Sequence, residues 1–276
     1  MKDYFGKEYD LSGKKMFLFD MDGTIYREND LYDGIIELLQ KIKNNGGRYA
    51  FITNNPAKSL KDYMKKLKKM GINGLTEDVF FSSAQAAVML LKDKFHNKLV
   101  YAQGTKSFIK ELRDNGINVT QKYSEAIDVV LVAFDPEITG EKLRTTCEVL
   151  CKLKDVPYYA TNPDWMCPVE FGGIPDCGSM CVGIKHASGR APIFIGKPEP
   201  TMILTLLKKF HISKEEAVVV GDRLYTDIAL GKKYGVTAAL VLTGETTIAD
   251  VCAAAEADKP DFVFDSLADV DKAIFN

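Results

Sequence analysis

Short apolar runs and amphipathic segments take turns along the first third of the chain. The run at 16–19 is continuously apolar, which is typical of a strand buried on both faces of a parallel sheet. The segment 34–44 instead spaces its apolar residues at the helical period, and Gly46 closes it. The same reasoning predicts three further elements, namely a strand at 49–52, a helix from its N-cap Ser59 to Gly71, and a strand at 79–81.

The last part of the chain shows the same alternation. It predicts strands at 193–195, 218–220, 238–242 and 262–264, with a helix at 201–210. Strands separated by helices indicate a parallel sheet with right-handed crossovers. We therefore expect an α/β fold to which both ends of the chain contribute.

The middle of the chain carries its own set of elements. The pattern there predicts strands at 99–101, 129–132 and 158–160, helices at 105–115 and 141–152, and a loop rich in Pro, Gly and Cys from Thr161 to Gly183. An insert of roughly 100 residues is long enough for a small core of its own. We therefore predict that 1–82 and 189–276 form one domain, interrupted by a second α/β domain at 83–188.

The composition narrows the function classes. With 276 residues, of which 46% are apolar and 27% charged, the chain fits one or two globular domains. Its formal net charge of −2 argues against a general nucleic-acid or membrane-surface binder. The first residues lack the apolar core of a signal peptide and no stretch reaches membrane-spanning length, so we expect a cytoplasmic protein. The six cysteines contain no CxxC pair, which favours free reduced thiols over a zinc site.

Polar side chains gather where four of the predicted strands end, at Asp20 and Asp22, Thr53 and Asn54, Lys197, and Asp222 and Asp227. The carboxyl ends of parallel strands meet at one edge of a sheet, where ligands of open α/β folds bind. Two carboxylates two residues apart repel each other unless a cation joins them. Hydroxyl and amide donors with one ammonium add the groups that bind an anion. The sequence therefore predicts a phosphate site with a metal at this edge.

These strand ends lie in four motifs that together resemble those of the haloacid dehalogenase superfamily of phosphatases. In chain order the motifs are Phe19-Asp20-Met21-Asp22-Gly23-Thr24, Ile52-Thr53-Asn54-Asn55, Gly196-Lys197-Pro198 and Gly221-Asp222-Arg223-Leu224-Tyr225-Thr226-Asp227. The particular residues in and around these motifs are similar to those of the NagD-type branch, which includes p-nitrophenylphosphatases, phosphoglycolate phosphatases and pyridoxal-phosphate phosphatases. That finer match lies in Gly23-Thr24-Ile25-Tyr26, Thr53-Asn54-Asn55, Gly196-Lys197-Pro198-Glu199-Pro200, Leu240-Val241-Leu242-Thr243-Gly244 and Thr161-Asn162-Pro163-Asp164.

The resemblance covers nearly the whole chain. It implies a Rossmann-like, doubly wound parallel sheet with an inserted α/β cap domain that confers substrate specificity. It also implies a hydrolase that dephosphorylates small metabolites with Mg²⁺ through an aspartyl-phosphate, and a homodimer through the cap. We accordingly expect a small phosphorylated metabolite as the partner, and neither nucleic acid nor a membrane.

The chemistry of such a site assigns a role to each residue. Asp20 is the expected nucleophile, and Asp22 the acid/base that protonates the leaving alkoxide and then takes a proton from water. Lys197 would neutralise the transferring group, and Gly23 would let the backbone approach the phosphate closely.

Phosphate and metal contacts complete the expected site. Thr53 and Asn54 would donate hydrogen bonds to phosphoryl oxygens. Asp20 and Asp222 would bind Mg²⁺ through their side chains, and the resemblance adds the backbone carbonyl of Asp22. Asp227 would be a further ligand, would hold the other ligands in place, or would only cap the helix that follows it. Its neighbour Arg223 is expected to form a salt bridge or to lie at the rim.

Two other functions stay open. A phosphomutase would return the phosphate to a sugar, although the cap resembles that of the phosphatases. A non-catalytic phosphate-sensing protein would not need the acid/base Asp22. The insert segment 162–181 holds acidic residues but neither Arg nor Lys. Unless Lys185 or Arg190 reaches the substrate, this favours sugar phosphates or nucleoside monophosphates over phosphoglycolate. Trp165 in this segment would either contact the substrate or pack.

Overall fold

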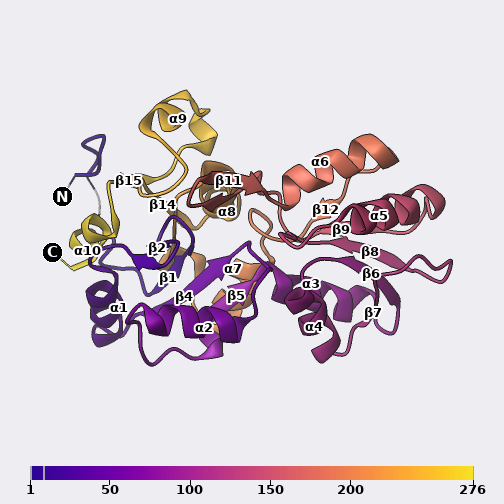
Figure 1. Cartoon of the computed structure of the whole chain (residues 1–276). Coiled ribbons are helices and arrows are strands. Elements are labelled where there is room, and N and C mark those ends of the chain that lie inside the picture. The colour runs from indigo at the N-terminus through magenta and orange to yellow at the C-terminus, as the bar shows by residue number, and fades with distance from the viewer. Residues whose placement is uncertain (1, 9, 276) are drawn as a thin grey trace. The chain divides into compact units, whose positions relative to one another are not determined.

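The computed structural model describes residues 2–8 and 10–275 and divides them into two compact units. The first unit takes its described residues from 1–53, 64–81 and 197–276, and the second consists of 54–63 and 82–196. Each unit has its own parallel sheet, and the elements of both are labelled in Figure 1. The chain therefore leaves the first unit twice, once for the short segment 54–63 and once for 82–196, and returns to it each time.

The first unit contains a six-stranded sheet with helices in the connections. Its strands, wholly or in most of their length, are β1 (Met16–Phe19), β4 (Arg48–Thr53), β5 (Phe80–Ser82), β13 (Ala217–Gly221), β14 (Thr237–Val241) and β15 (Phe262–Phe264), with a small antiparallel pair of β2 (Tyr26–Arg27) and β3 (Asp30–Leu31). Its helices, α2 being shared with the second unit, are α1 (Ile35–Asn44), α2 (Leu60–Lys69), α7 (Thr201–Phe210), α8 (Ala229–Tyr234), α9 (Ile248–Ala253) and α10 (Leu267–Phe275).

The strand order β15-β14-β13-β1-β4-β5 makes the first sheet doubly wound. From β1 the chain adds β4 and β5 on one side, and it later adds β13, β14 and β15 on the other (Figure 1). The order therefore reverses between β1 and β13, which pair in parallel with Phe19 opposite Val220. Both strands are buried along their whole length, as their apolar sequences predict. The expected Rossmann-like α/β fold is confirmed.

The second unit has a five-stranded sheet of its own. Its strands are β6 (Leu99–Gln103), β7 (Asn118–Thr120), β8 (Val129–Val132), β9 (Tyr158–Ala160) and β12 (Ile193–Phe194), in the order β12-β9-β8-β6-β7, and all their pairings are parallel. The unit adds an antiparallel hairpin of β10 (Met166–Val169) and β11 (Gly172–Pro175), and four helices, α3 (Ser83–Lys94), α4 (Lys106–Asp114), α5 (Gly140–Lys152) and α6 (Cys177–Ser188).

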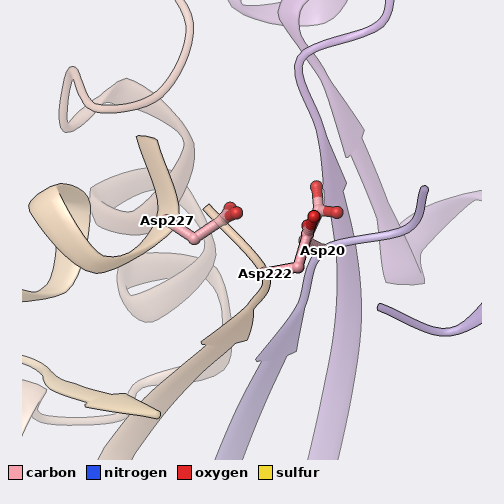
Figure 2. A group of neighbouring side chains, drawn as sticks. All are labelled: Asp20, Asp222 and Asp227. Atoms are coloured by element: carbon pink, nitrogen blue, oxygen red, sulfur yellow. The ribbon is translucent and has the colours of Figure 1, made fainter. Parts of the chain in front are cut away.

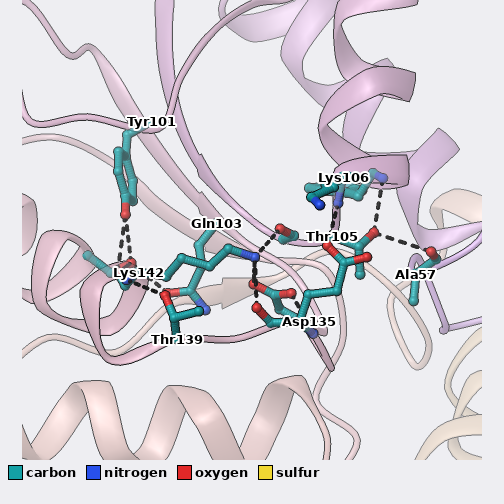
Figure 3. A network of polar contacts seen from close by, with 12 residues as sticks. Ala57, Tyr101, Gln103, Thr105, Lys106, Asp135, Thr139 and Lys142 are labelled. Atoms are coloured by element: carbon teal, nitrogen blue, oxygen red, sulfur yellow. Dashed lines mark hydrogen bonds and ion pairs between the residues drawn. The ribbon is translucent and has the colours of Figure 1, made fainter.

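A polar network joins the loops that follow β6 and β8 in this sheet (Figure 3). The ammonium of Lys142 binds the buried carboxylate of Asp135 at 2.8 Å and the carbonyl oxygens of Gly104 and Glu137 at 3.1 and 3.2 Å. These contacts fasten α5 to the strand ends, so this part of the unit is held by charge as well as by its apolar core.

Two expectations about the elements were wrong, and one helix was not predicted. The segment 193–195 does not join the sheet of the first unit, because β12 pairs with β9 of the second. The loop expected from Thr161 to Gly183 contains the β10–β11 hairpin and most of α6. Helix α3 was not predicted. Segments rich in Ala, Gly and Cys lack a clear polar face, so periodicity does not reveal them.

The cysteines and the helices bear on the expectations for disulfides, zinc sites and membrane spans. All six cysteines are free thiols, as expected. Among the helices of the described part of the chain, none combines the length and the apolar character needed to cross a membrane.

Candidate active site

The two central strands of the first sheet each carry an aspartate just past their last residue. Asp20 follows β1, which ends at Phe19, and Asp222 follows β13, which ends at Gly221. Since β1 and β13 flank the point where the strand order reverses, both carboxylates lie where doubly wound sheets bind ligands. Figure 2 shows these two carboxylates side by side, with the side chain of Asp227 turned toward them.

Asp227 comes from a wide helical turn, Leu224–Ile228, that precedes α8. Its Oδ2 accepts a hydrogen bond from the backbone N–H of Arg223 at 3.2 Å, which folds the side chain back toward the end of β13. One oxygen from each carboxylate of Asp20, Asp222 and Asp227 lies within 4.8 Å of the other two, and all three residues are buried. Asp227 therefore belongs to the cluster and does not merely cap α8.

The ammonium of Lys197 lies between two of these carboxylates. Its Nζ is 2.5 Å from Oδ1 of Asp20 and 2.6 Å from Oδ1 of Asp227, and it donates to the carbonyl of Ile52 in β4 at 3.3 Å. The side chain is only 2% exposed. Burial by itself lowers the pKa of Lys197, but the two carboxylates outweigh it and raise the pKa above its ordinary value. Lys197 is therefore a fixed positive charge.

Asp222 occupies a close-fitting cradle of backbone. Its Oδ2 accepts from the backbone N–H of Glu245 at 2.7 Å, and its Oδ1 lies 3.4 Å from the hydroxyl of Thr24. A Cβ at Gly23 or Gly244 would lie only 2.7 or 1.9 Å from Oδ2. Gly23 also has a φ of 88°, in the region that favours glycine. Both positions must therefore lack a side chain for the carboxylate to stand there.

The cluster holds more negative than positive charge. Burial raises the pKa of Asp20 well above its usual range, and the carboxylates of Asp227 and Asp222 add to this against the opposing effect of Lys197. Burial, with the Asp227 carboxylate next, raises the pKa of Asp222 to about 7. A further cation would therefore stabilise the ionised forms of both groups.

The donor set fits a divalent metal ion. Hard divalent cations bind carboxylate oxygens, and two positive charges would offset the surplus of three carboxylates over one ammonium. Asp20, Asp222 and Asp227 are the residues that could hold such an ion. Within the residues that the structure describes, no other group of three His, Cys, Asp or Glu side chains comes as close together.

Three further predicted residues of the first unit lie in the loops beside this cluster. Asp22 and Gly23 are in the turn after β1, where Asp22 is half-buried and its backbone bridges to Tyr26. Thr53 is the buried last residue of β4, the strand that pairs with β1. The sheet therefore brings Asp22, Gly23 and Thr53 to the same edge as Asp20.

Asn54 contacts the insert through its side chain. It belongs to the second unit, where its side-chain Nδ2 donates to Oδ2 of Asp164 at 2.7 Å. Its backbone carbonyl accepts from the hydroxyl of Ser83 at 2.5 Å. The Asn54 amide thus binds a carboxylate of the insert, and its expected role as a phosphate donor stays a prediction.

The sequence did not reveal the residues that support Asp222 from other loops. Thr24 and Glu245 contact its carboxylate, and the hydroxyl of Thr243 donates to the carbonyl of Gly23 at 2.7 Å. Thr24, Thr243 and Gly244 lie in two of the sequence motifs that carried the family resemblance. Those motifs were the signal in the sequence that could have pointed to these residues. The guanidinium of Arg223 lies 2.8 Å from the carboxylate of Glu245, so its expected salt bridge is confirmed.

Comparison with known proteins agrees with this geometry. A model of the haloacid dehalogenase-like hydrolases matches residues 17–118, and a second, HAD-hydrolase-like model matches 194–270. Phosphoglycolate phosphatase 2 of Arabidopsis thaliana is 31% identical over 276 residues, which cover 93% of this chain and 92% of that protein.

Solved structures show the same likeness over nearly the whole fold. The 4-nitrophenylphosphatase of Thermotoga maritima is 37% identical, with a TM-score of 0.88 over 96% of this chain and 98% of that one. A glycerol phosphate phosphatase of Mycobacterium tuberculosis, in complex with magnesium, is 25% identical, with a TM-score of 0.85 over 95% of this chain and 78% of that one. Fold, site and relatives thus agree, and the chain belongs to the haloacid dehalogenase-like hydrolases, as a phosphatase of the NagD and p-nitrophenylphosphatase branch.

Proposed function

We propose that the protein is a Mg²⁺-dependent phosphomonoesterase that dephosphorylates small metabolites through an aspartyl-phosphate on Asp20. The observation that carries this proposal is the buried cluster of Asp20, Asp222 and Asp227 around Lys197. Mg²⁺ is held in proteins by one or two carboxylates together with waters and substrate oxygens. The magnesium bound to the solved relative from Mycobacterium tuberculosis supports the choice of ion.

Asp20 would act as the nucleophile. A carboxylate oxygen attacks phosphorus, the bond from phosphorus to the leaving oxygen breaks, and an aspartyl-phosphate forms. Lys197 holds the attacking carboxylate at 2.5 Å, favours its ionised form and offsets the charge of the approaching phosphoryl group. When bound, Mg²⁺ would supply further charge cancellation and would orient the carboxylates and the phosphate.

Asp22 completes the reaction as acid and base. It gives a proton to the leaving alkoxide in the first step and takes one from the attacking water in the second. Its half-buried position in the turn after β1 keeps it accessible to substrate, two residues from the nucleophile. Water attack on the aspartyl-phosphate then releases inorganic phosphate and restores the Asp20 carboxylate.

Residues at the same edge of the sheet would bind the phosphate. Thr53 would donate its hydroxyl to a phosphoryl oxygen, and the backbone at Gly23 would approach the phosphate closely. Asp227 keeps Lys197 in place through its ion pair of 2.6 Å. These residues recognise the phosphoryl group only, so they act on many esters alike.

The substrate body is recognised elsewhere, and we propose a neutral one. The segment 162–181 offers carboxylates and an exposed Trp165 but no basic side chain, so a second anionic group would find no partner in it. Sugar phosphates and nucleoside monophosphates then suit the protein better than phosphoglycolate. The glycerol phosphate phosphatase among the solved relatives supports this choice, whereas the phosphoglycolate phosphatase of Arabidopsis thaliana points the other way.

Release of inorganic phosphate from a panel of phosphomonoesters tests both parts of the proposal. The panel contains sugar phosphates, nucleoside monophosphates, glycerol phosphate, phosphoglycolate and 4-nitrophenyl phosphate, with Mg²⁺ or with EDTA. We expect turnover that needs the metal, that disappears in Asp20→Asn, and that favours neutral-bodied esters. A clear preference for phosphoglycolate would contradict the proposed substrate class, and an isomerised ester without phosphate release would indicate a mutase.

A further inference from the structure

A chain of buried hydrogen bonds in the second unit begins at Asn54. The Nδ2 of Asn54 donates to Oδ2 of Asp164 at 2.7 Å, and the Nδ2 of Asn162 donates to the same oxygen at 2.9 Å. Asn162 also donates to Oδ1 of Asp176 at 2.8 Å. All four side chains are at most 5% exposed. A carboxylate oxygen that accepts two amide donors away from water fixes both amides in one orientation.

The segment that carries Asp164 is itself firmly held. The backbone carbonyl of Asp164 accepts from the N–H of Gly178 at 2.9 Å, in the first turn of α6, and Asp176 is the N-cap of that helix. A Cβ at Gly178 would lie 2.2 Å from the carbonyl oxygen of Pro163. Residues 163–164 therefore pack closely against the first turn of α6, which supports the carboxylate of Asp164.

The amide of Asn54 also fills the space beside Gly196. A Cβ at Gly196 would lie 2.5 Å from Oδ1 of Asn54 and 2.6 Å from the carbonyl oxygen of Thr161. The N–H of Gly196 donates to that carbonyl at 2.8 Å. Asn54 and Gly196 are thus held against each other by the same segment that carries Asp164.

These two residues lie at two of the four points at which the chain passes between the units. Asn54 is bonded to Thr53 and Gly196 to Lys197, and in both cases the next residue belongs to the first unit. The hydrogen bonds around Asp164 therefore fix the backbone directly beside one expected phosphate donor and beside the ammonium that binds Asp20. A small shift of Asn54 or Gly196 would therefore also shift the residue bonded to it, Thr53 or Lys197.

We infer that Asp164 is a positioning residue for the phosphatase reaction, and that it acts through the side chain of Asn54. The inference rests on the proposed function. By holding the Asn54 amide against Gly196, Asp164 sets the positions of Thr53 and Lys197 for the reaction. Asn54 then contributes through the backbone that it fixes, and its side chain need not touch the phosphate.

The test compares Asp164→Ala and Asp164→Asn with the wild type, using 4-nitrophenyl phosphate as substrate and Mg²⁺ as metal. Alanine removes the acceptor, and we expect kcat to fall by about 10–100-fold because misplaced reacting groups lose orientation. Asparagine keeps an acceptor oxygen, and we expect it to retain kcat within about threefold of the wild type. In the Asn54→Ala background, Asp164→Ala should change kcat by less than about twofold, since both variants break the same contact.

Asp135→Ala is the matched control. Asp135 is a fully buried carboxylate of the same unit, and its partner is Lys142 (Figure 3). We expect this variant to lower the melting temperature while leaving kcat within about twofold of the wild type, because it unsettles the unit without touching Asn54. An equal loss of kcat in Asp135→Ala would attribute the effect to the stability of the unit and would overturn the inference.

Two more outcomes would overturn it. One is wild-type kcat in Asp164→Ala, and the other is a full additional loss when Asp164→Ala is placed on Asn54→Ala. Hydrogen–deuterium exchange gives a readout that does not need turnover. We expect Asp164→Ala, but not Asp135→Ala, to speed exchange in peptides covering 54–57 and 195–197, and unchanged exchange there would refute the proposed contact. Failure of the proposed function would instead show as wild-type protein without activity on any ester.

Discussion

At the scale of single residues, protons and a metal ion would compete for the buried carboxylates of the site. The pKa of Asp222 is raised to about 7, first by burial and then by the Asp227 carboxylate. A cation can bind only the ionised form, so protons and metal oppose each other at this group. The pH dependence of metal binding therefore reports directly on the cluster.

We expect the affinity for Mg²⁺ to rise about tenfold between pH 6 and pH 8, since the ionised fraction of a group with a pKa of about 7 rises by that factor. Isothermal titration calorimetry at the two pH values measures it. In Asp222→Asn we expect affinity to be low at both. An affinity of the wild type that does not change over this range would contradict the environment assigned to Asp222.

In the metal-free protein, the carboxyl group of Asp222 should make the free energy of unfolding fall as the pH rises, whereas the affinity for Mg²⁺ rises. The folded pKa of Asp222 lies above its ordinary value of 3.8, so the folded state binds the proton more tightly than the unfolded chain. This contribution to stability is fully present below about pH 4 and is lost as the pH rises through about 7. Urea unfolding in EDTA should show it, and Asp222→Asn should weaken it. Stability that instead rises over this interval because of Asp222 would refute the assignment.

Lys197 should be essential for a different reason. Lys197→Met leaves the buried carboxylates of Asp20 and Asp227 without their ammonium, so we expect kcat to fall by about 10²–10³-fold, as when one preorganised charge is removed. Steady-state turnover of 4-nitrophenyl phosphate measures the loss. Lys142→Met is the control, because it removes a comparable ion pair in the second unit and should leave kcat near the wild-type value. A similar loss in both variants would contradict a specific role for Lys197.

Some features of the site could be predicted from the sequence, and others could not. The sequence predicted that Asp20, Asp222 and Asp227 meet, because parallel strands bring their ends to one edge. Lys197 meets them as predicted, although the strand before it, β12, belongs to the sheet of the second unit. The sequence could not predict the direction of the Asn54 side chain, since that depends on a carboxylate 110 residues away. The contacts of Glu245 with Asp222 likewise come from a loop that no local pattern links to it.

At the scale of elements, α6 shows how packing decides what a segment becomes. Its sequence contains Gly178 and Gly183, which lower helix propensity, and the sequence pattern predicted a loop there. The side chain of Asp176 caps the helix, and β10 and β11 pack against it. Similar tertiary support explains α3, whose alanine-rich face is buried, and β12, whose two paired residues are too few to reveal their partner.

The two glycines of α6 should respond in opposite ways to alanine. A Cβ at Gly178 would lie 2.2 Å from the carbonyl oxygen of Pro163, so we expect Gly178→Ala to reduce the free energy of unfolding by about 1–3 kcal/mol. At Gly183 a Cβ meets nothing within 4 Å, and Gly183→Ala should raise that free energy by about 0.5–1 kcal/mol through helix propensity. Urea denaturation measures both. Equal effects of the two substitutions would contradict the close packing of α6 on Pro163.

At the scale of the whole molecule, the fold separates the reacting groups from the segment proposed to recognise the substrate body. The residues that could hold the metal, Asp20, Asp222 and Asp227, all belong to the first unit. The acidic segment 162–181 belongs to the second. Under the proposed function, one set of residues would attack the phosphate ester while another would choose among substrates.

Metal binding should accordingly protect one unit more than the other. A ligand that binds only the folded state at 100 times its dissociation constant stabilises it by about 2.7 kcal/mol. We expect Mg²⁺ to slow hydrogen–deuterium exchange in peptides around the ends of β1 and β13, with much smaller changes in β6 and β8 of the second unit. Exchange that slows mainly in the second unit would place the metal site elsewhere.

The central claim is that Asp20 carries the phosphoryl group during turnover, and trapping that species tests it most directly. 4-Nitrophenolate leaves without needing a proton, so Asp22→Asn should still be phosphorylated by 4-nitrophenyl phosphate, while the loss of its base slows hydrolysis of the intermediate. The measurement is mass spectrometry of acid-quenched Asp22→Asn, with peptide mapping. We expect one phosphoryl group on the peptide that contains Asp20 and none in Asp20→Asn/Asp22→Asn. A phosphoryl group on another residue, or turnover by Asp20→Asn, would contradict the proposed mechanism.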